Sequence, residues 1–239
     1  HPYYSHNLNP MKRALILIIM FWNLLFGHDA QAQDWANKMR YAQANADLLN
    51  QKAEQPMVVM MGNSITEFWE ETHPRFFAEH RLVGRGISGQ VSSQMLVRFR
   101  QDVINLHPRC VVINGGTNDI AENNGPYDED ITIDNIRSMV ELALSHRINV
   151  VLSSVLPCDG FIWNPTVKDI QNKIASINRR IVMLAQEFSL PYIDYYTHLV
   201  NGKSRALNQA YTEDGVHPNG NGYDVMEPLL LNTLRLLDE

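Results

Sequence analysis

Five short apolar runs, rich in β-branched residues, constrain the fold more than any other feature of the sequence. They are MVVMM (57–61), RLVGR (81–85), CVVIN (110–114), NVVLSSV (149–155) and PYIDYY (191–196). Stretches of helical periodicity separate or flank them, at 34–53, 64–80, 90–106, 131–146, 166–188 and 222–237. Strands that alternate with helices and are apolar on both faces form parallel sheets covered on each side. The pattern predicts an α/β fold, a three-layer sandwich around a five-stranded parallel sheet.

Composition excludes several classes of protein. The 239 residues are 45% hydrophobic and 19% charged, which is ordinary for a globular chain and unlike a disordered or low-complexity one. The formal net charge is −6, and acids and bases are mixed along the chain. Because no block of Lys and Arg could follow a phosphate backbone, we expect no nucleic acid partner.

The first 32 residues differ from the rest. A basic pair (12–13) precedes the apolar run ALILIIMFWNLLF (14–26), and DAQAQ follows it, in which Ala30 and Ala32 fit a small-x-small cleavage site. The alternative is a membrane anchor, but this run falls short of the ~20 residues that a spanning helix needs. We therefore expect a secretory signal peptide and no stable membrane insertion.

The predicted domain organisation follows from that leader. Residues 1–32 comprise ten upstream residues that carry no signal we can interpret, and then the signal peptide. Residues 33–239 show no repeat, linker or shift of composition, so we expect a single domain, exported to the periplasm or the medium. Its oligomeric state cannot be predicted from the sequence.

The predicted sheet also indicates where a site would lie, because open α/β sheets bind ligands at the carboxyl ends of their strands. The segments GNSIT, GRGISG, GGTND and LPCDGFIWNP follow the first four strands. The same layout separates the cysteines, since Cys110 opens the third strand and Cys158 lies beyond the end of the fourth. Such ends are roughly 15 to 20 Å apart, and a disulfide needs Cα atoms within ~7 Å. Two thiols are expected rather than a bridge.

Ser64 lies at a junction between a predicted strand and a predicted helix. A serine in that place is most often an N-cap, but a helix N-terminus also favours a nucleophile. The stretch is not the G-x-S-x-G elbow of α/β-hydrolases, because Thr66 stands where the second glycine would be. Position alone leaves both interpretations open.

A serine nucleophile needs a base, and the base needs an orienting acid. In YTEDGVHPNGNGY, Asp214 precedes His217 by three residues, which lets the carboxylate reach the near ring nitrogen. Glu70 and His73 have the same spacing, but His73 would lie about 13 Å along a helix that starts at Ser64. The remaining histidines lie at the wrong end of the sheet, on the surface or, for His198, without an acid at that spacing.

An oxyanion needs hydrogen-bond donors. GRGISG holds three glycines in six residues, so that backbone N–H groups such as that of Gly86 could approach a ligand closely, although a flexible turn would look the same. GGTND presents Asn118, whose amide suits an oxyanion hole. The alternative is an Asx-turn made by Asn118 and Asp119. That all four features fall at the same sheet edge is the main evidence for a site.

Together these motifs resemble the four blocks of the SGNH (GDSL-type) hydrolases, in order and spacing, over residues 56–230. GISGQVSSQMLVRF and GGTNDIAENNG are most similar to the branch of platelet-activating-factor acetylhydrolase-like esterases. The resemblance implies a flavodoxin-like sheet of order 2-1-3-4-5. It also implies a triad of Ser64, His217 and Asp214, and an oxyanion hole made by the N–H groups of Ser64 and Gly86 with the Asn118 side chain. One departure is Asn63, where the family usually has Asp.

The expected function is an exported serine esterase without cofactor or metal. Its substrate would be a small acyl ester, such as an acetyl ester, of a carbohydrate. The alternatives are a lysophospholipase or thioesterase and a non-catalytic glycan-binding module. Trp69, Phe161 and Trp163 could form an aromatic wall, but single aromatic residues are most often core, so none is assigned to binding.

Overall fold

Five parallel strands form the predicted sheet in the computed structural model, which describes residues 34–51 and 57–237. The strands are β1 (Val58–Gly62), β2 (Leu82–Gly86), β3 (Cys110–Ile113), β4 (Asn149–Ser153) and β5 (Tyr192–Ile193). Their order is β2-β1-β3-β4-β5. In the register of the sheet, Gly62 lies opposite Gly86 and Met61 lies opposite Ile113. The predicted fold class and strand order are confirmed.

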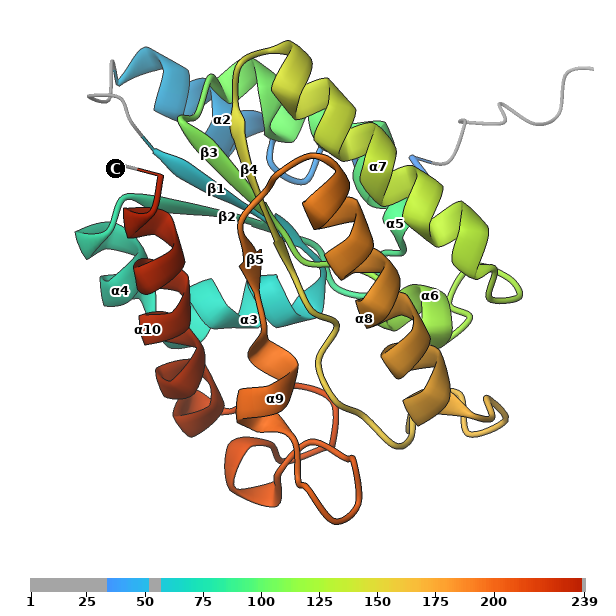
Figure 1. Ribbon diagram of the computed structural model, residues 1–239. Coiled ribbons are helices and arrows are strands. Elements are labelled where there is room, and N and C mark those ends of the chain that lie inside the picture. Colours follow the sequence, from blue (N-terminus) through green and yellow to red (C-terminus); the bar gives the residue numbers. More distant parts are fainter. Residues whose placement is uncertain (1–33, 52–56, 238–239) are drawn as a thin grey trace, which may run out of the picture. The chain divides into compact units, whose positions relative to one another are not determined.

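Helices cover both faces of the sheet and make three layers (Figure 1). They are α2 (Ala42–Asn50), α3 (Ser64–Thr72), α4 (Pro74–Glu79), α5 (Ser92–Asp102), α6 (Thr117–Ile120), α7 (Glu129–Ser145), α8 (Ile170–Glu187), α9 (Tyr195–Leu199) and α10 (Gly220–Arg235). Short 3₁₀ helices span Ile104–Leu106 and Gln209–Tyr211.

Alternate residues of each strand enter two separate hydrophobic cores. One core joins Val59, Met61, Val111, Ile113, Val150 and Leu152 to apolar residues of α5, α7 and α8. The other joins Val58, Met60, Cys110, Val112, Val151 and Ile193 to α3, α4 and α10. Burial on both faces explains why the strands read as continuous apolar runs.

Three predicted elements differ from the structure, because one is divided into two helices and two are shorter than expected. The helix expected over 64–80 divides at His73, because Pro74 lacks an N–H and begins the separate helix α4. The helix expected over 90–106 ends at Asp102 and continues as a 3₁₀ turn. The strand expected over 191–196 has only two residues, because Asp194 accepts the Thr197 N–H at 3.1 Å and so caps α9.

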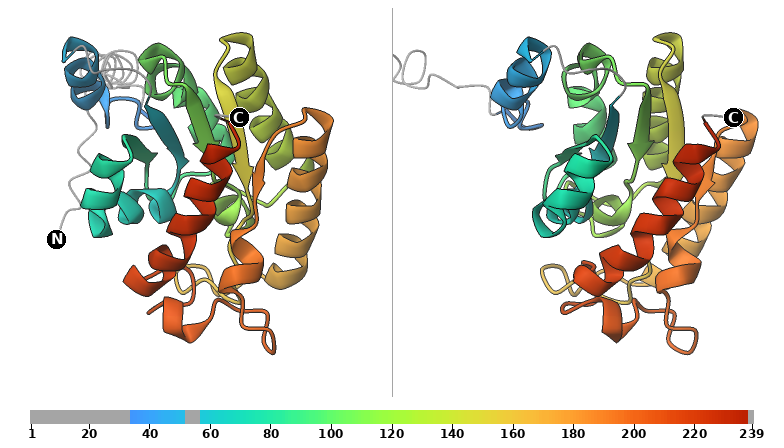
Figure 2. Two further views of the ribbon diagram at one scale, coloured as in Figure 1. Left: turned by 60° about the vertical axis from the view of Figure 1, so that its left-hand side comes forward. Right: turned by 90° about the vertical axis from the view of Figure 1, so that its left-hand side faces the viewer.

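The loops that follow the strands gather beyond one end of the sheet. Figure 2 shows the segments 156–169 and 200–219 at that end, beyond the carboxyl ends of β4 and β5. Cys110 in β3 and Cys158 after β4 are buried and are not disulfide-bonded. These loops lie at the carboxyl ends of the strands, which is where the sequence predicts a site.

Residues Ala36–Glu239 form one compact unit, to which these layers belong. The predicted signal peptide lies outside the described residues, so the domain boundary after residue 32 stays a prediction. In residues 34–51 and 57–237, no helix is long and apolar enough to cross a bilayer.

Candidate active site

Ser64 is the first residue of α3 and follows the end of β1 by two positions. The residue between them, Asn63, caps the helix, because its Oδ1 accepts the Ile65 N–H at 3.1 Å. The Ser64 hydroxyl is therefore not needed as a cap. Its Oγ lies 2.8 Å from Nε2 of His217, a residue 153 positions away in the sequence.

His217 is held by the loop that precedes α10. Its Nδ1 lies 2.6 Å from Asp214 Oδ2, while Asp214 Oδ1 accepts the N–H groups of Val216 and His217, each at 2.8 Å. The Thr212 hydroxyl donates to the His217 carbonyl oxygen at 2.7 Å and closes the loop. This geometry favours the tautomer with the proton on Nδ1, which leaves Nε2 free to accept a proton from Ser64.

The surroundings of Asp214 keep its carboxylate ionised. Partial burial by itself would raise the pKa of Asp214. The hydrogen bonds from the His217 ring and from the backbone N–H groups of His217 and Val216 outweigh burial and hold the pKa of this carboxyl below its usual value. A negative charge therefore faces the imidazole at neutral pH, where it would stabilise a protonated His217.

Asn118 lies in α6, directly beyond the end of β3, and is 3% exposed. Gly116, with φ of 115°, turns the chain there. The Asn118 Nδ2 donates to the Gln90 carbonyl oxygen at 3.0 Å, and its Oδ1 accepts from Asn123 Nδ2 at 3.1 Å. A primary amide has two N–H donors, and the second has no acceptor among the described residues.

A cavity of about 320 Å³ joins these side chains. Its wall consists of Ser64, Phe68, Ser88, Gly89, Asn118, Asn123, Trp163 and His217. The rings of Phe68 and Trp163 flank the His217 imidazole, with centroid distances of 5.1 and 6.2 Å. Ser64, Asn118 and His217, which lie far apart in the sequence, thus meet in one cavity.

The structure places Gly89, not Gly86, on the cavity wall. A Cβ atom on Gly86 would lie 2.3 Å from the Glu67 nitrogen and 2.5 Å from the Asn63 carbonyl oxygen, so this glycine lets β2 pack against the first turn of α3. Within the described part of the chain, the N–H groups of Gly89 and Ser64 have no hydrogen-bond acceptor. The three glycines of GRGISG are alike in sequence, so only the fold distinguishes Gly89.

The three aromatic residues singled out in the sequence have different environments. Trp163 is 46% exposed, lines the cavity and packs on Phe161, which is buried behind it with a centroid distance of 5.2 Å. Trp69 is core, because it is 2% exposed and stacks on Phe76 and Tyr223. Phe68, the neighbour of Trp69, is the aromatic residue of α3 that reaches the cavity. A helical period of 3.6 gives adjacent residues different faces.

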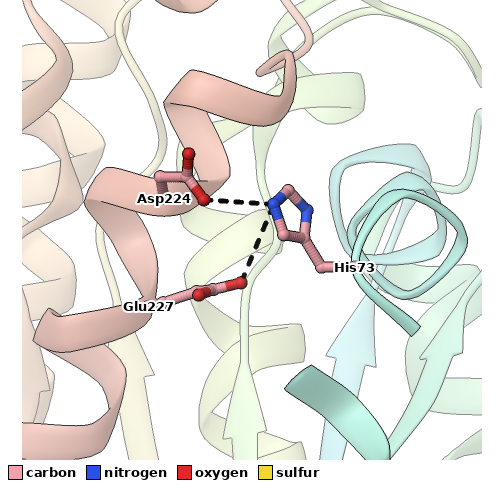
Figure 3. Close-up of side chains that lie close together, drawn as sticks. All are labelled: His73, Asp224 and Glu227. Carbon is pink, nitrogen blue, oxygen red and sulfur yellow. Dashed lines mark hydrogen bonds and ion pairs between the residues drawn. The ribbon is translucent and has the colours of Figure 1, made fainter. Parts of the chain in front are cut away.

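The second histidine and acid pair, Glu70 and His73, does not form in the structure. Glu70 Oε1 accepts the Gly84 N–H at 3.3 Å, and His73 lies at the opposite end of α3 from its first residue. Instead, His73 Nε2 lies 3.2 Å from Asp224 Oδ1 and 4.0 Å from Glu227 Oε1, both on α10 (Figure 3).

This cluster of His73, Asp224 and Glu227 has the ligand types for a divalent cation, with ligand atoms within 4.8 Å of one another. Burial raises the pKa of Glu227, whereas Asp224 is largely exposed. The contact between His73 and Asp224 links α3 to α10. None of the cluster's three residues lines the cavity that holds Ser64.

The chain from carboxylate to imidazole to hydroxyl is the arrangement found in serine hydrolases. A model of the GDSL-like lipase/acylhydrolase family matches residues 60–225, a range that includes Ser64, Asp214 and His217. The protein therefore belongs to the GDSL-like lipase/acylhydrolase family, which confirms the resemblance seen in the motifs. It is a hydrolase of the esterase type.

Two solved structures from Bacteroides are similar over most of the chain. A protein of Bacteroides fragilis assigned as an acylhydrolase is 55% identical, with a TM-score of 0.83, and the match covers 86% of this chain and 99% of that one. A GDSL-like lipase from Bacteroides thetaiotaomicron is 51% identical, with a TM-score of 0.82 and coverage of 84% and 98%.

A more distant match is a variant of Axe2, an acetylxylan esterase from Geobacillus stearothermophilus. It is 19% identical with a TM-score of 0.61, and the match covers 75% of this chain and 94% of that one. This similarity concerns the fold alone. A comparison with curated proteins gives no match.

Proposed function

We propose that Ser64 is the nucleophile of an ester hydrolysis that passes through an acyl-enzyme. The observation that carries the proposal is the unbroken contact from Ser64 Oγ to His217 Nε2 at 2.8 Å and from His217 Nδ1 to Asp214 at 2.6 Å. His217 takes the hydroxyl proton as Oγ bonds to the ester carbonyl carbon, and gives that proton to the departing alcohol. Water then repeats the same steps on the acyl-enzyme and releases the acid.

The oxyanion of each tetrahedral intermediate would accept hydrogen bonds from the N–H groups of Ser64 and Gly89 and from the Asn118 amide. Ser64 contributes from the N-terminus of α3, where the helix dipole also favours negative charge. We assign this role to Gly89 rather than to Gly86, because Gly89 lines the cavity and its N–H has no acceptor in the described residues. Asn118 contributes its remaining amide hydrogen.

The cavity favours a short acyl group, with acetyl as the first candidate. None of the described residues that line it is aliphatic, and its volume of about 320 Å³ is near the lower end of the ~300–1,000 Å³ of ligand pockets, which suits a short acyl group better than a long chain. Trp163 presents an exposed ring at this wall, which suits stacking on a sugar. We therefore assign an acetylated carbohydrate as the substrate class.

Export forms part of the same proposal and rests on residues 11–32 of the sequence. A secreted esterase would meet polysaccharides outside the cytoplasm. Mass spectrometry of the natively expressed protein should find a mature chain that begins at Gln33. An intact amino terminus on protein recovered from the cytoplasm would contradict export without touching the chemistry.

Two variants test the chemistry with p-nitrophenyl acetate. Ser64→Ala should abolish activity and labelling by a fluorophosphonate, and Asn118→Ala should lower kcat by about 10²–10³-fold. Wild-type activity of Ser64→Ala would refute the mechanism. A series of p-nitrophenyl esters from acetyl to decanoyl tests the acyl group. Activity that rises with chain length would favour a lysophospholipase or thioesterase instead.

A further inference from the structure

Asn123 connects three parts of the cavity wall through one side chain. Its Nδ2 donates to Asn118 Oδ1 and to the Gly89 carbonyl oxygen, each at 3.1 Å. Its Oδ1 accepts from the Trp163 Nε1–H at 2.8 Å. Every polar atom of the Asn123 amide is therefore engaged, and two of its three partners hold the proposed oxyanion donors.

These contacts decide which way the Asn118 amide faces. In the observed orientation, Oδ1 accepts from Asn123 and Nδ2 donates to the Gln90 carbonyl oxygen. A rotation by 180° would place two NH₂ groups against each other at Asn123 and two oxygens against each other at Gln90. Asn123 thus disfavours the flipped amide, which would present an oxygen to the oxyanion in place of an N–H.

The same side chain restrains Gly89. This residue has φ of 78°, in the left-handed region, and its carbonyl oxygen is bound by Asn123. Its neighbour Ser88 is held from the other side, because Glu67 Oε2 accepts the Ser88 N–H at 2.8 Å and the Ser88 hydroxyl at 2.6 Å. The loop that carries the Gly89 N–H is fixed at both ends.

Trp163 in turn fixes Asn123. An indole N–H can only donate, so the bond from Trp163 requires the oxygen of Asn123 on that side. The NH₂ group must then face Asn118 and Gly89. Trp163, in the segment after β4, therefore orients the amide of Asn123 toward Gly89, which follows β2, and Asn118, which follows β3.

We propose that Asn123 is a positioning residue that sets the oxyanion donors Asn118 and Gly89 in their working orientation, with Trp163 orienting Asn123. This inference rests on the proposed function, since it needs an oxyanion that Asn118 and Gly89 contact. It assigns Asn123 no contact with the reacting atoms. Its effect should therefore appear in stabilisation of the transition state rather than in proton transfer.

Asn123→Leu is the central test, because leucine has a similar size and neither donates nor accepts. With p-nitrophenyl acetate, kcat should fall by about 10- to 100-fold, as expected for misplaced catalytic groups, while KM changes by less than about twofold. The Ki of a methyl trifluoromethyl ketone, which forms a tetrahedral adduct with the serine, should rise by a similar factor. The shape of the pH profile should not change, because the hydrogen bonds that join His217 to Ser64 and Asp214 do not involve Asn123.

Asn124→Leu is the matched control. Asn124 is also an exposed asparagine, but it lines a separate cavity with Tyr127 and Ile131. Its kcat and its Ki for the ketone should match those of the wild type. Trp163→Phe keeps an aromatic ring but loses the indole N–H together with the second ring of the indole, so its kcat should fall in the same direction as that of Asn123→Leu, by a smaller factor.

A double-mutant cycle separates positioning from a general structural effect. If Asn123 acts through Asn118, its loss should cost less in the Asn118→Ala background than in the wild type. Wild-type kcat and Ki in Asn123→Leu would overturn the inference, as would fully additive losses in the cycle. If Asn123→Leu failed to fold, wild-type kinetics of Trp163→Phe would overturn it. Wild-type kcat in Asn118→Ala would instead refute the proposed oxyanion hole.

Discussion

Gly86→Ala tests whether the packing of β2 against the helix of Ser64 fixes the site. The added methyl carbon would lie 2.3 Å from the Glu67 nitrogen, 2.5 Å from the Asn63 carbonyl oxygen and 2.9 Å from the Thr66 carbonyl carbon. All three atoms belong to the backbone, so no rotation of a side chain can relieve the overlap. The end of β2 and the first turn of α3 must separate.

The size of that movement follows from the distances. At 2.3 Å the methyl carbon is about 1.1 Å inside the 3.4 Å at which ordinary contact begins. Overpacking of this kind costs about 1–3 kcal/mol of unfolding free energy. A displacement of about 1 Å at Ser64 can also cost about 10²-fold in rate. We therefore expect both losses in Gly86→Ala, measured by urea denaturation and by hydrolysis of p-nitrophenyl acetate.

Gly202→Ala is the matched control, because no atom lies within 4 Å of the position of its added Cβ. It should keep both stability and kcat. An alanine retains its backbone N–H, so a role of Gly86 as oxyanion donor alone would predict little change in Gly86→Ala. Wild-type stability together with wild-type kcat in this variant would refute the packing account.

Three further outcomes follow from the structure. The pKa of Asp214 is lower in the folded protein than in the unfolded chain. Ionised Asp214 therefore stabilises the fold at a pH above the pKa of the unfolded state, and this contribution is lost as the pH falls through the pKa of the folded state. The urea midpoint of Asp214→Asn should vary less than that of the wild type between about pH 5 and 2. Cys110 and Cys158 are buried, and burial raises the pKa of Cys158 to about 12, so Ellman's reagent should titrate two thiols after unfolding and neither rapidly before it. Tyr223 donates to the Ile65 carbonyl oxygen at 2.8 Å in a buried contact between α10 and α3, so Tyr223→Phe should lower the unfolding free energy by about 0.5–1.5 kcal/mol and leave kcat within about twofold.

The sequence predicts the sheet well because burial on both faces leaves a strong local signal. The runs at 57–61 and 110–114 are apolar at nearly every position, and they became β1 and β3. The fifth run, at 191–196, reads as a longer strand because a cap such as Asp194 acts through geometry rather than hydrophobicity. Local sequence does not state whether that carboxylate will face a helix N-terminus.

The predictability of the site residues depends on how each one acts. Spacing could pair Asp214 with His217, because both lie in one loop and their contact is local. The choice of Gly89 and the role of Asn123 depend on which atoms of three separate loops meet, and nothing within one loop records that. The sequence alone could not decide whether Ser64 is a helix cap or a nucleophile. The structure shows that Asn63, not Ser64, caps the helix.

The separation of 153 residues between Ser64 and His217 has a consequence for how the enzyme acquires activity as it folds. Ser64 follows the first strand of the chain, and His217 comes after the last. Contacts between residues so far apart in the sequence close late, because the intervening chain must lose its entropy first. During refolding from urea, recovery of esterase activity should therefore lag behind recovery of helical circular dichroism. Nascent chains that have not yet delivered His217 and α10 to the sheet would therefore lack esterase activity.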